Sequence, residues 1–188
     1  MEQAPVQPDA LARRRRVEDR VYVALGSNLG EREAHLVAAL DALHASEGIG
    51  VLAVSAVYET EPVGPPPQGR YLNAVARLRT ALAPRVLLRR LLEIEAARGR
   101  ERGPLRHAAR TLDLDLLLYG ELRIDEPGLA VPHPRLAQRP FVLEPLSDVA
   151  ARVLHPVLNE TIESLARRVR DPAAVRRREE VLPWPSSQ

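Results

Sequence analysis

The chain has 188 residues, of which 45% are hydrophobic and 28% charged, and its formal net charge is +2. This length suits one ordinary domain with a full core, and no apolar run approaches the roughly 18 residues that a membrane-spanning helix needs. The chain lacks cysteine and its 27 basic residues are all arginine, which excludes disulfides, thiolate chemistry and phosphate loops that depend on lysine.

The N-terminal residues predict a tail, a strand and a helix. Residues 1–19 are polar, include the run Arg13–Arg16 and have no apolar signal-peptide core, so they predict a disordered extension and a cytoplasmic location. Residues 20–25 predict the first strand, and the helical spacing of apolar residues predicts a helix over 31–44. The Gly-rich turn 26–30 between them could hold a phosphate, although it lacks the P-loop pattern.

The next stretch predicts two strands around a long loop. Residues 50–58 form an apolar strand pattern, whereas residues 59–70 hold too much Pro and Gly for regular structure. Loops this long in compact domains are often functional. Residues 71–79 alternate, which places Tyr71, Asn73 and Val75 on one face and Leu72, Ala74, Ala76 and Leu78 on the other.

A second helix and a basic loop follow. Pro84 suits the first turn of a helix, and residues 86–97 carry its apolar stripe. Residues 98–109 are polar, contain Gly103 and Pro104 and predict a mobile basic loop.

An acidic pair lies in the last strand of the pattern, within Arg110-Thr-Leu-Asp-Leu-Asp115. Period-two alternation sends Leu112, Leu114 and Leu116 to the core and leaves Asp113 and Asp115 side by side on the other face. Two carboxylates this close repel each other unless a cation lies between them, and Mg²⁺ prefers such oxygen ligands. An exposed strand face with two solvated acids is the alternative.

The remaining residues complete the predicted fold. Residues 120–125 predict a turn and a short strand that forms a hairpin with the acidic strand, residues 134–138 and 161–170 predict helical stretches, and the chain is expected to fray from Glu179. The order strand, helix, strand, strand, helix, strand predicts an α+β, ferredoxin-like antiparallel sheet with helices packed on one face. We expect a single domain over 20–178, with a tail over 179–188.

Basic side chains surround the acidic pair in the sequence. Arg98, Arg100, Arg102 and Arg106 precede it, Arg110 borders it, and His133 and Arg139 follow it. Arginine binds phosphate in bidentate fashion, so acids and arginines together favour a polyphosphate with its metal, most simply ATP with Mg²⁺. Surface salt bridges are the alternative explanation for any one of these arginines.

Seven short motifs resemble those of the 6-hydroxymethyl-7,8-dihydropterin pyrophosphokinase family in order and spacing, over about residues 20–150. They are Ala24–Leu29, Ser55–Thr60, Tyr71–Ala74, Ile94–Arg100, Arg110–Asp115, Val131–His133 and Arg139–Phe141. The resemblance implies transfer of the β,γ-diphosphoryl group of ATP to the pterin hydroxymethyl oxygen, with release of AMP, in folate biosynthesis.

The resemblance also implies a role for each matching residue. Asp113 and Asp115 would bind two Mg²⁺ ions; Arg100, Arg110, His133 and Arg139 would hold the triphosphate, with Arg102 and Glu95 near the nucleotide. Tyr71 and Phe141 would sandwich the pterin, Asn73 would bind its edge, and the segment with Thr60, Glu61 and Val63 would add backbone hydrogen bonds. In this chain His107 replaces an aromatic residue of the basic loop, which puts the usual loop closure in doubt.

Two other functions remain open from the residues alone. An RNA-binding module on a ferredoxin-like sheet would use exposed aromatic residues, but the aromatic content is only 3% and the acids would repel phosphate without an ion. A different metal-dependent nucleotidyl transferase would release pyrophosphate instead of AMP. We therefore expect a monomer that acts on small molecules, with no nucleic-acid partner and no membrane.

Overall fold

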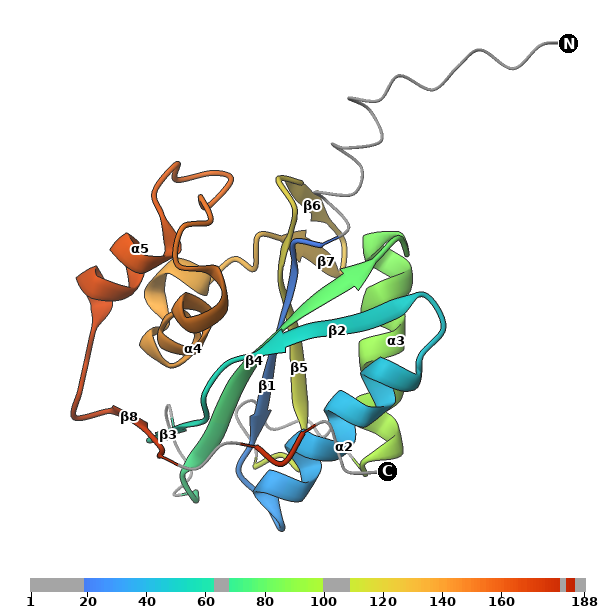
Figure 1. The fold of residues 1–188 in the computed structure, drawn as a ribbon, viewed down its shortest axis with the longest axis vertical. Helices are drawn as coiled ribbons and strands as arrows, with labels where there is room; N and C mark the ends of the chain where they lie inside the picture. The colour runs from blue at the N-terminus through green and yellow to red at the C-terminus, as the bar shows by residue number, and fades with distance from the viewer. Residues whose placement is uncertain (1–18, 63–67, 100–108, 180–181, 185–188) are drawn as a thin grey trace, which may run out of the picture.

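The computed structural model describes residues 19–62, 68–99, 109–179 and 182–184 (Figure 1). The central sheet consists of β1 (Val21–Ser27), β2 (Ile49–Val54), β3 (Tyr58–Thr60), β4 (Tyr71–Thr80), β5 (Asp113–Tyr119) and β8 (Val175–Arg177). The helices are α2 (Arg32–Ala45), α3 (Pro84–Ala97), α4 (Pro140–Ala150) and α5 (Ile162–Val169), with a 3-10 turn, η1, at Leu136–Gln138. The strands β6 (Ile124–Glu126) and β7 (Leu129–Val131) form a separate pair.

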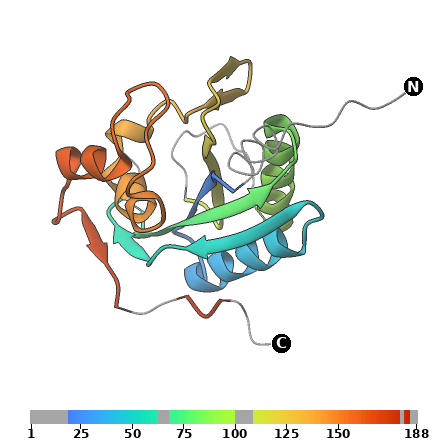
Figure 2. The ribbon, with the colours of Figure 1, turned by 45° about the horizontal axis from the view of Figure 1, so that its top comes forward.

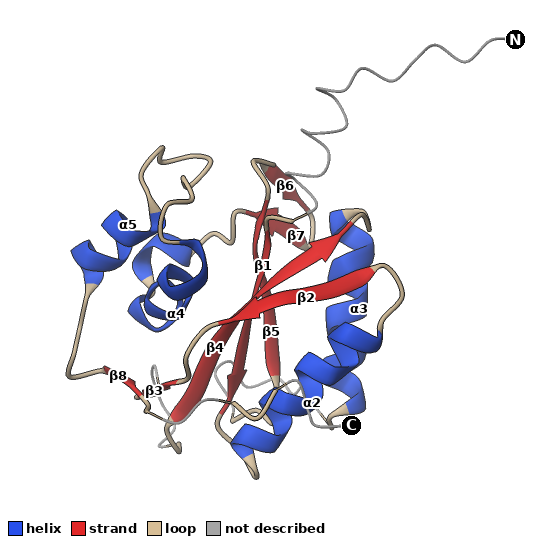
Figure 3. Ribbon diagram, in the orientation of Figure 1, coloured by secondary structure: helices blue, strands red, loops and turns tan. Residues whose placement is uncertain are grey.

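The sheet confirms the predicted ferredoxin-like topology. Its strand order is β5-β1-β4-β3-β8, β2 also pairs with β4, and all of these pairings are antiparallel (Figure 3). The acidic strand β5 therefore lies beside β1, and the strand with Tyr71 and Asn73 lies on the other side of β1. This order brings side chains that are about 40 residues apart in the chain onto one face.

The predicted strand over 50–58 is in fact two strands, β2 and β3. The break falls at Ser55, whose buried hydroxyl accepts a hydrogen bond from the backbone N–H of Val75 at 2.9 Å. A side chain that bonds the neighbouring strand in this way replaces the regular ladder and allows the chain to change direction. The short β3 then pairs with the first residues of β4, Tyr71–Asn73, and brings Thr60 to the cavity described below.

Helices cover both faces of the sheet, not one (Figure 2). The predicted helices α2 and α3 pack against Val21, Val23 and Leu25 of β1 and their neighbours. On the other face α4 and α5 pack around Tyr22 and Val75. The sequence did not predict α4, whose first residue is Pro140 and whose middle residue is the buried Pro145. Burial of its apolar face outweighs the missing backbone hydrogen bond at that proline.

Two further expectations were wrong. The strand β6 pairs with β7, so the hairpin is Ile124–Glu126 with Leu129–Val131 and does not include β5. The C-terminal residues are not frayed at Leu182 and Trp184, because Leu182 is buried and Trp184 packs against the core beside α2.

The predicted disordered extension, residues 1–19, lies almost entirely outside the described residues. Among the helices of the described ranges, none has both the length and the hydropathy to cross a membrane.

Candidate active site

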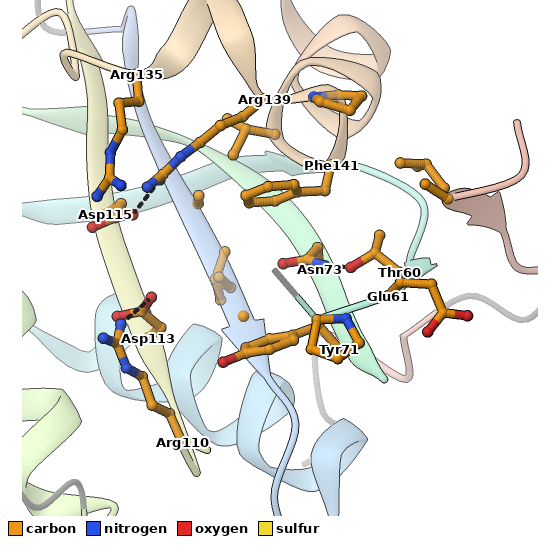
Figure 4. A pocket seen from close by; sticks show the side chains of 18 of the residues that line it. Thr60, Glu61, Tyr71, Asn73, Arg110, Asp113, Asp115, Arg135, Arg139 and Phe141 are labelled. Atoms are coloured by element: carbon orange, nitrogen blue, oxygen red, sulfur yellow. Dashed lines mark hydrogen bonds and ion pairs between the residues drawn. The ribbon is translucent and has the colours of Figure 1, made fainter. Parts of the chain in front are cut away.

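A cavity of about 940 Å³ opens on the sheet face that α4 covers, between β5, β1 and β4. Ten of the predicted site residues line it: Thr60, Glu61, Tyr71, Asn73, Arg110, Asp113, Asp115, His133, Arg139 and Phe141 (Figure 4). Val63, Arg100 and Arg102, together with His107, lie outside the described residues. The predicted alternation of β5 and β4 is confirmed, because Leu112, Leu114, Leu116, Leu72 and Ala74 are buried on the opposite face.

The two acids at one end of the cavity each have an arginine partner. Arg110 donates to Asp113 at 2.8 Å, and Arg139 donates to Asp115 at 3.5 Å. The acids lie on β5, whereas Arg139 is the residue that immediately precedes α4. Each pair is only partly exposed, so each arginine offsets the charge of its acid.

The donor set of the acids fits Mg²⁺ better than a transition metal. Both side chains offer hard carboxylate oxygens. Among the described residues, no group of three or more His, Asp or Glu side chains gathers that could hold a metal alone. A divalent ion at Asp113 and Asp115 therefore needs further oxygen ligands, which the phosphates of a nucleotide would supply.

His133 stands beside Asp115 as a neutral imidazole. Burial lowers its pKa, nearby Asp115 opposes that shift, and Arg139 adds to it. Its Nδ1 accepts the backbone N–H of Arg135 at 3.2 Å, which places the proton of the neutral ring on Nε2. Nε2 lies 3.8 Å from the carboxylate of Asp115, so this N–H points toward the acid end of the cavity.

Arg135 is a cavity residue that the sequence reasoning missed. Its side chain extends toward Asp115 next to that of Arg139 (Figure 4). Burial lowers the pKa of Arg139, and the positive charge of Arg135 lowers it further. Within the described ranges no carboxylate forms an ion pair with Arg135. The sequence feature that could have identified Arg135 is its position two residues after His133.

The other end of the cavity carries two rings and an amide. Tyr71 of β4 and Phe141 of α4 lie on opposite sides, with Asn73 between them (Figure 4). Asn73 Nδ2 donates to Thr60 Oγ1 at 2.8 Å, which leaves the amide oxygen for a ligand. A Cβ at Gly26 would lie 3.2 Å from that oxygen, so a larger residue at this position would press on the amide of Asn73. This end can hold a flat heterocycle with a polar edge.

Asn28 holds the base of the site and was also missed. It is buried, accepts the backbone N–H of Arg110 at 2.7 Å, and donates to Gln68 Oε1 at 2.9 Å and to Gly69 O at 3.3 Å. Arg110 leads directly into the acidic strand, and Gln68 lines the ring end of the cavity. One side chain in the predicted phosphate turn therefore ties the two ends together.

Glu95 does not reach the cavity. It is 1% exposed on α3 and accepts the backbone N–H of Leu114 at 2.7 Å, on the opposite face of β5 from the acids. Its position supports the acidic strand from behind. The structure therefore separates Glu95 from Arg110, His133 and Arg139, the predicted nucleotide residues that line the cavity.

Comparison with known proteins shows that the chain is similar to one enzyme family. The family model described as 7,8-dihydro-6-hydroxymethylpterin-pyrophosphokinase matches residues 22–151. Over 131 residues the chain is 51% identical to the 2-amino-4-hydroxy-6-hydroxymethyldihydropteridine pyrophosphokinase of Pseudomonas aeruginosa, which covers 70% of this chain and 80% of that protein. The enzyme of the same name from Bacillus subtilis is 43% identical, over 70% and 78% of the two chains.

Some relatives are longer proteins. A folate synthesis bifunctional protein of Arabidopsis thaliana is 47% identical over 70% of this chain but only 27% of its own length. A solved structure titled as HPPK-DHPS in complex with substrates has a TM-score of 0.62 and 14% identity, covering 79% of this chain and 44% of that one. At that identity the structural likeness supports the fold alone.

Proposed function

The chain belongs to the 7,8-dihydro-6-hydroxymethylpterin-pyrophosphokinase family and is thus a pyrophosphokinase of folate biosynthesis. On this basis we propose that it transfers the β,γ-diphosphoryl group of ATP to the hydroxymethyl oxygen of 6-hydroxymethyl-7,8-dihydropterin and releases AMP. The observation that carries the proposal is a single cavity with paired acids and arginines at one end and two rings with an amide at the other.

At the acid end, Asp113 and Asp115 would hold two Mg²⁺ ions, which supply charge neutralisation on the phosphates when bound. As the acids take up metal, Arg110 and Arg139 become available to phosphate oxygens in bidentate contacts. His133 would donate its Nε2–H to a phosphate oxygen. Arg100 and Arg102, which lie outside the described residues, would bind the nucleotide as the family resemblance implies.

At the ring end, the pterin would stack between Tyr71 and Phe141. Asn73 is oriented by Thr60 and would accept an N–H of the pterin edge through its oxygen. The backbone around Glu61 would add hydrogen bonds to the pterin. Val63 has the same predicted role. This arrangement directs the hydroxymethyl group toward the acid end, where the phosphates lie.

The test combines product analysis with one pair of variants. The enzyme, MgATP and the reduced pterin alcohol should yield AMP; release of pyrophosphate would instead indicate a nucleotidyl transferase. Asp115→Asn should lower turnover about 100- to 1000-fold, the scale of losing one transition-state charge contact. The matched control Asp125→Asn removes an exposed acid of β6 and should keep full turnover. Near-normal turnover of Asp115→Asn at saturating Mg²⁺ would refute the assignment.

Three expectations accompany this proposal. The enzyme acts in the cytoplasm, it is a monomer, and it binds neither nucleic acid nor membranes. Sedimentation of the purified chain, alone and with RNA, tests the last two directly.

A further inference from the structure

One wall of the ring end comes from the C-terminal part of the chain. Ala174 and Val175 line the cavity, although the family model ends at residue 151. Val175 begins β8, which follows α5 and returns to the edge of the sheet (Figure 1). We call residues 174–179 and 182–184 the C-terminal strap.

The strap holds β3 from the outside. The three residues of β3 pair with β4 on one side and with β8 on the other, with Thr60 opposite Val175. Beyond the strand, the backbone N–H of Glu61 donates to Ala174 O at 3.3 Å. A strand this short is weakly held by a single neighbour. The position of Thr60, and through it the amide of Asn73, therefore depends on the strap.

The strap is fixed at its start by a turn. The carboxylate of Asp171 accepts the backbone N–H groups of Ala173 and Ala174, each at 3.1 Å, and the carbonyl of Asp171 accepts that of Val175 at 2.9 Å. Asp171 itself is exposed and lies away from both core clusters. The turn sets the point at which β8 meets β3.

The strap is fixed at its far end on α2. The backbone N–H of Arg178 donates to Val57 O at 2.9 Å, and its guanidinium pairs with Glu33. Farther on, the ring of Trp184 meets that of His44 edge-on, with centroids 5.8 Å apart. These contacts hold the strap against α2 and lie outside the cavity.

We propose that the C-terminal strap is a positioning element for pterin recognition: it holds β3 so that Thr60 and Asn73 are set for the pterin edge, while Val175 closes the wall. This inference rests on the proposed function of the ring end. It makes no demand on the acid end, whose arginines and acids belong to β5 and to the residues before α4. Loosening the strap should therefore weaken pterin binding and leave nucleotide binding nearly unchanged.

Two variants loosen the strap from opposite ends. Trp184→Ala removes the contact with His44, and Asp171→Ala removes the turn at an exposed site. If β3 is then set for binding only about a fifth of the time, the apparent Kd for pterin rises about fivefold. Calorimetry with 6-hydroxymethyl-7,8-dihydropterin, in the presence of Mg²⁺ and a nonhydrolysable ATP analogue, measures this, and titration of the analogue alone should change less than about twofold. Trp184→Phe should restore most of the pterin affinity.

A matched control separates positioning from general loss of stability. Leu88→Ala truncates a partly buried residue of α3 that packs against the same core as Trp184 but does not line the cavity. It should lower the melting temperature without changing the pterin Kd. Unchanged pterin affinity in both strap variants, or an equal loss of nucleotide affinity, would overturn the inference. Failure of the unmodified enzyme to bind pterin would instead refute the proposed function.

Discussion

Replacement of Asn28 by alanine tests the link between the two ends of the site. The side chain is 6% exposed and makes three hydrogen bonds, to the backbone N–H of Arg110, to Gln68 and to Gly69. A hydrogen bond contributes about 1 kcal/mol net, and loss of a partner for a buried group costs more. We therefore expect Asn28→Ala to lower the free energy of unfolding by about 2–3 kcal/mol, which corresponds to a melting temperature lower by about 4–12 °C.

The same variant should lower turnover beyond the effect on stability. Without Asn28 the backbone at Arg110 is free to shift, and the guanidinium that contacts Asp113 shifts with it. Misplacement of a catalytic group by about 1 Å can cost roughly 100-fold in rate. Asn28→Asp is the matched variant for turnover: a carboxylate keeps the acceptor for the Arg110 N–H, although its second oxygen faces the oxygens of Gln68 and Gly69 and lowers stability.

Urea unfolding and AMP release at saturating substrates measure the two effects. Asn28→Asp should keep more turnover than Asn28→Ala, because the acceptor for the Arg110 N–H remains. The reasoning fails if Asn28→Ala lowers the free energy of unfolding by less than about 0.5 kcal/mol, which is the scale of an ordinary surface substitution. It also fails if the two variants lose turnover equally, since the retained acceptor would then have no role.

Three further predictions concern other residues. Tyr71→Ala and Phe141→Ala should each weaken pterin binding by about 1–3 kcal/mol, the scale of base–aromatic stacking. Calorimetry should find that nucleotide binding is much less affected. Equal losses of affinity for pterin and nucleotide would indicate collapse of the fold. Arg135→Gln should weaken binding of the nucleotide analogue with Mg²⁺ by about 1 kcal/mol, roughly fivefold. The control Arg89→Gln removes an exposed charge of α3 and should leave this binding unchanged. Equal effects of the two variants would mean only a general charge effect. Burial lowers the pKa of His155, so the unfolded chain takes up its proton first as the pH falls below about 6.5, and the unfolding free energy falls in that range. His155→Gln should lose less stability between pH 7.5 and 5.5 by urea unfolding, and parallel profiles would contradict this.

The long periodic elements were predictable from sequence because one face of each is buried. Alternation in β5 placed Asp113 and Asp115 together, and alternation in β4 placed Tyr71 beside Asn73, as the structure confirms. The short strands β3 and β8 were not predictable, since three residues carry no period and their pairing is decided by tertiary contacts.

Other parts of the site were missed for different reasons. Pro140 and Pro145 conceal α4, because prolines normally end a helix pattern and only the packing of its apolar face outweighs them. The sequence indicated only that Gly26 and Asn28 belong to a Gly-rich turn that could hold a phosphate. Their observed roles, a floor under Asn73 and a tie to Arg110, depend on neighbours that are distant in the sequence.

The position of Arg139 has a consequence for the binding of the two substrates. Its guanidinium pairs with Asp115 at 3.5 Å and lies 5.5 Å from the centre of the Phe141 ring. Nucleotide with its metal would draw Arg139 away from Asp115, and the contact with the ring would change at the same time. The contact between Arg139 and Phe141 would therefore couple the acid end of the cavity to the ring end. The apparent affinity for pterin should accordingly change when the nucleotide analogue and Mg²⁺ are bound, and calorimetry with and without the analogue measures that coupling.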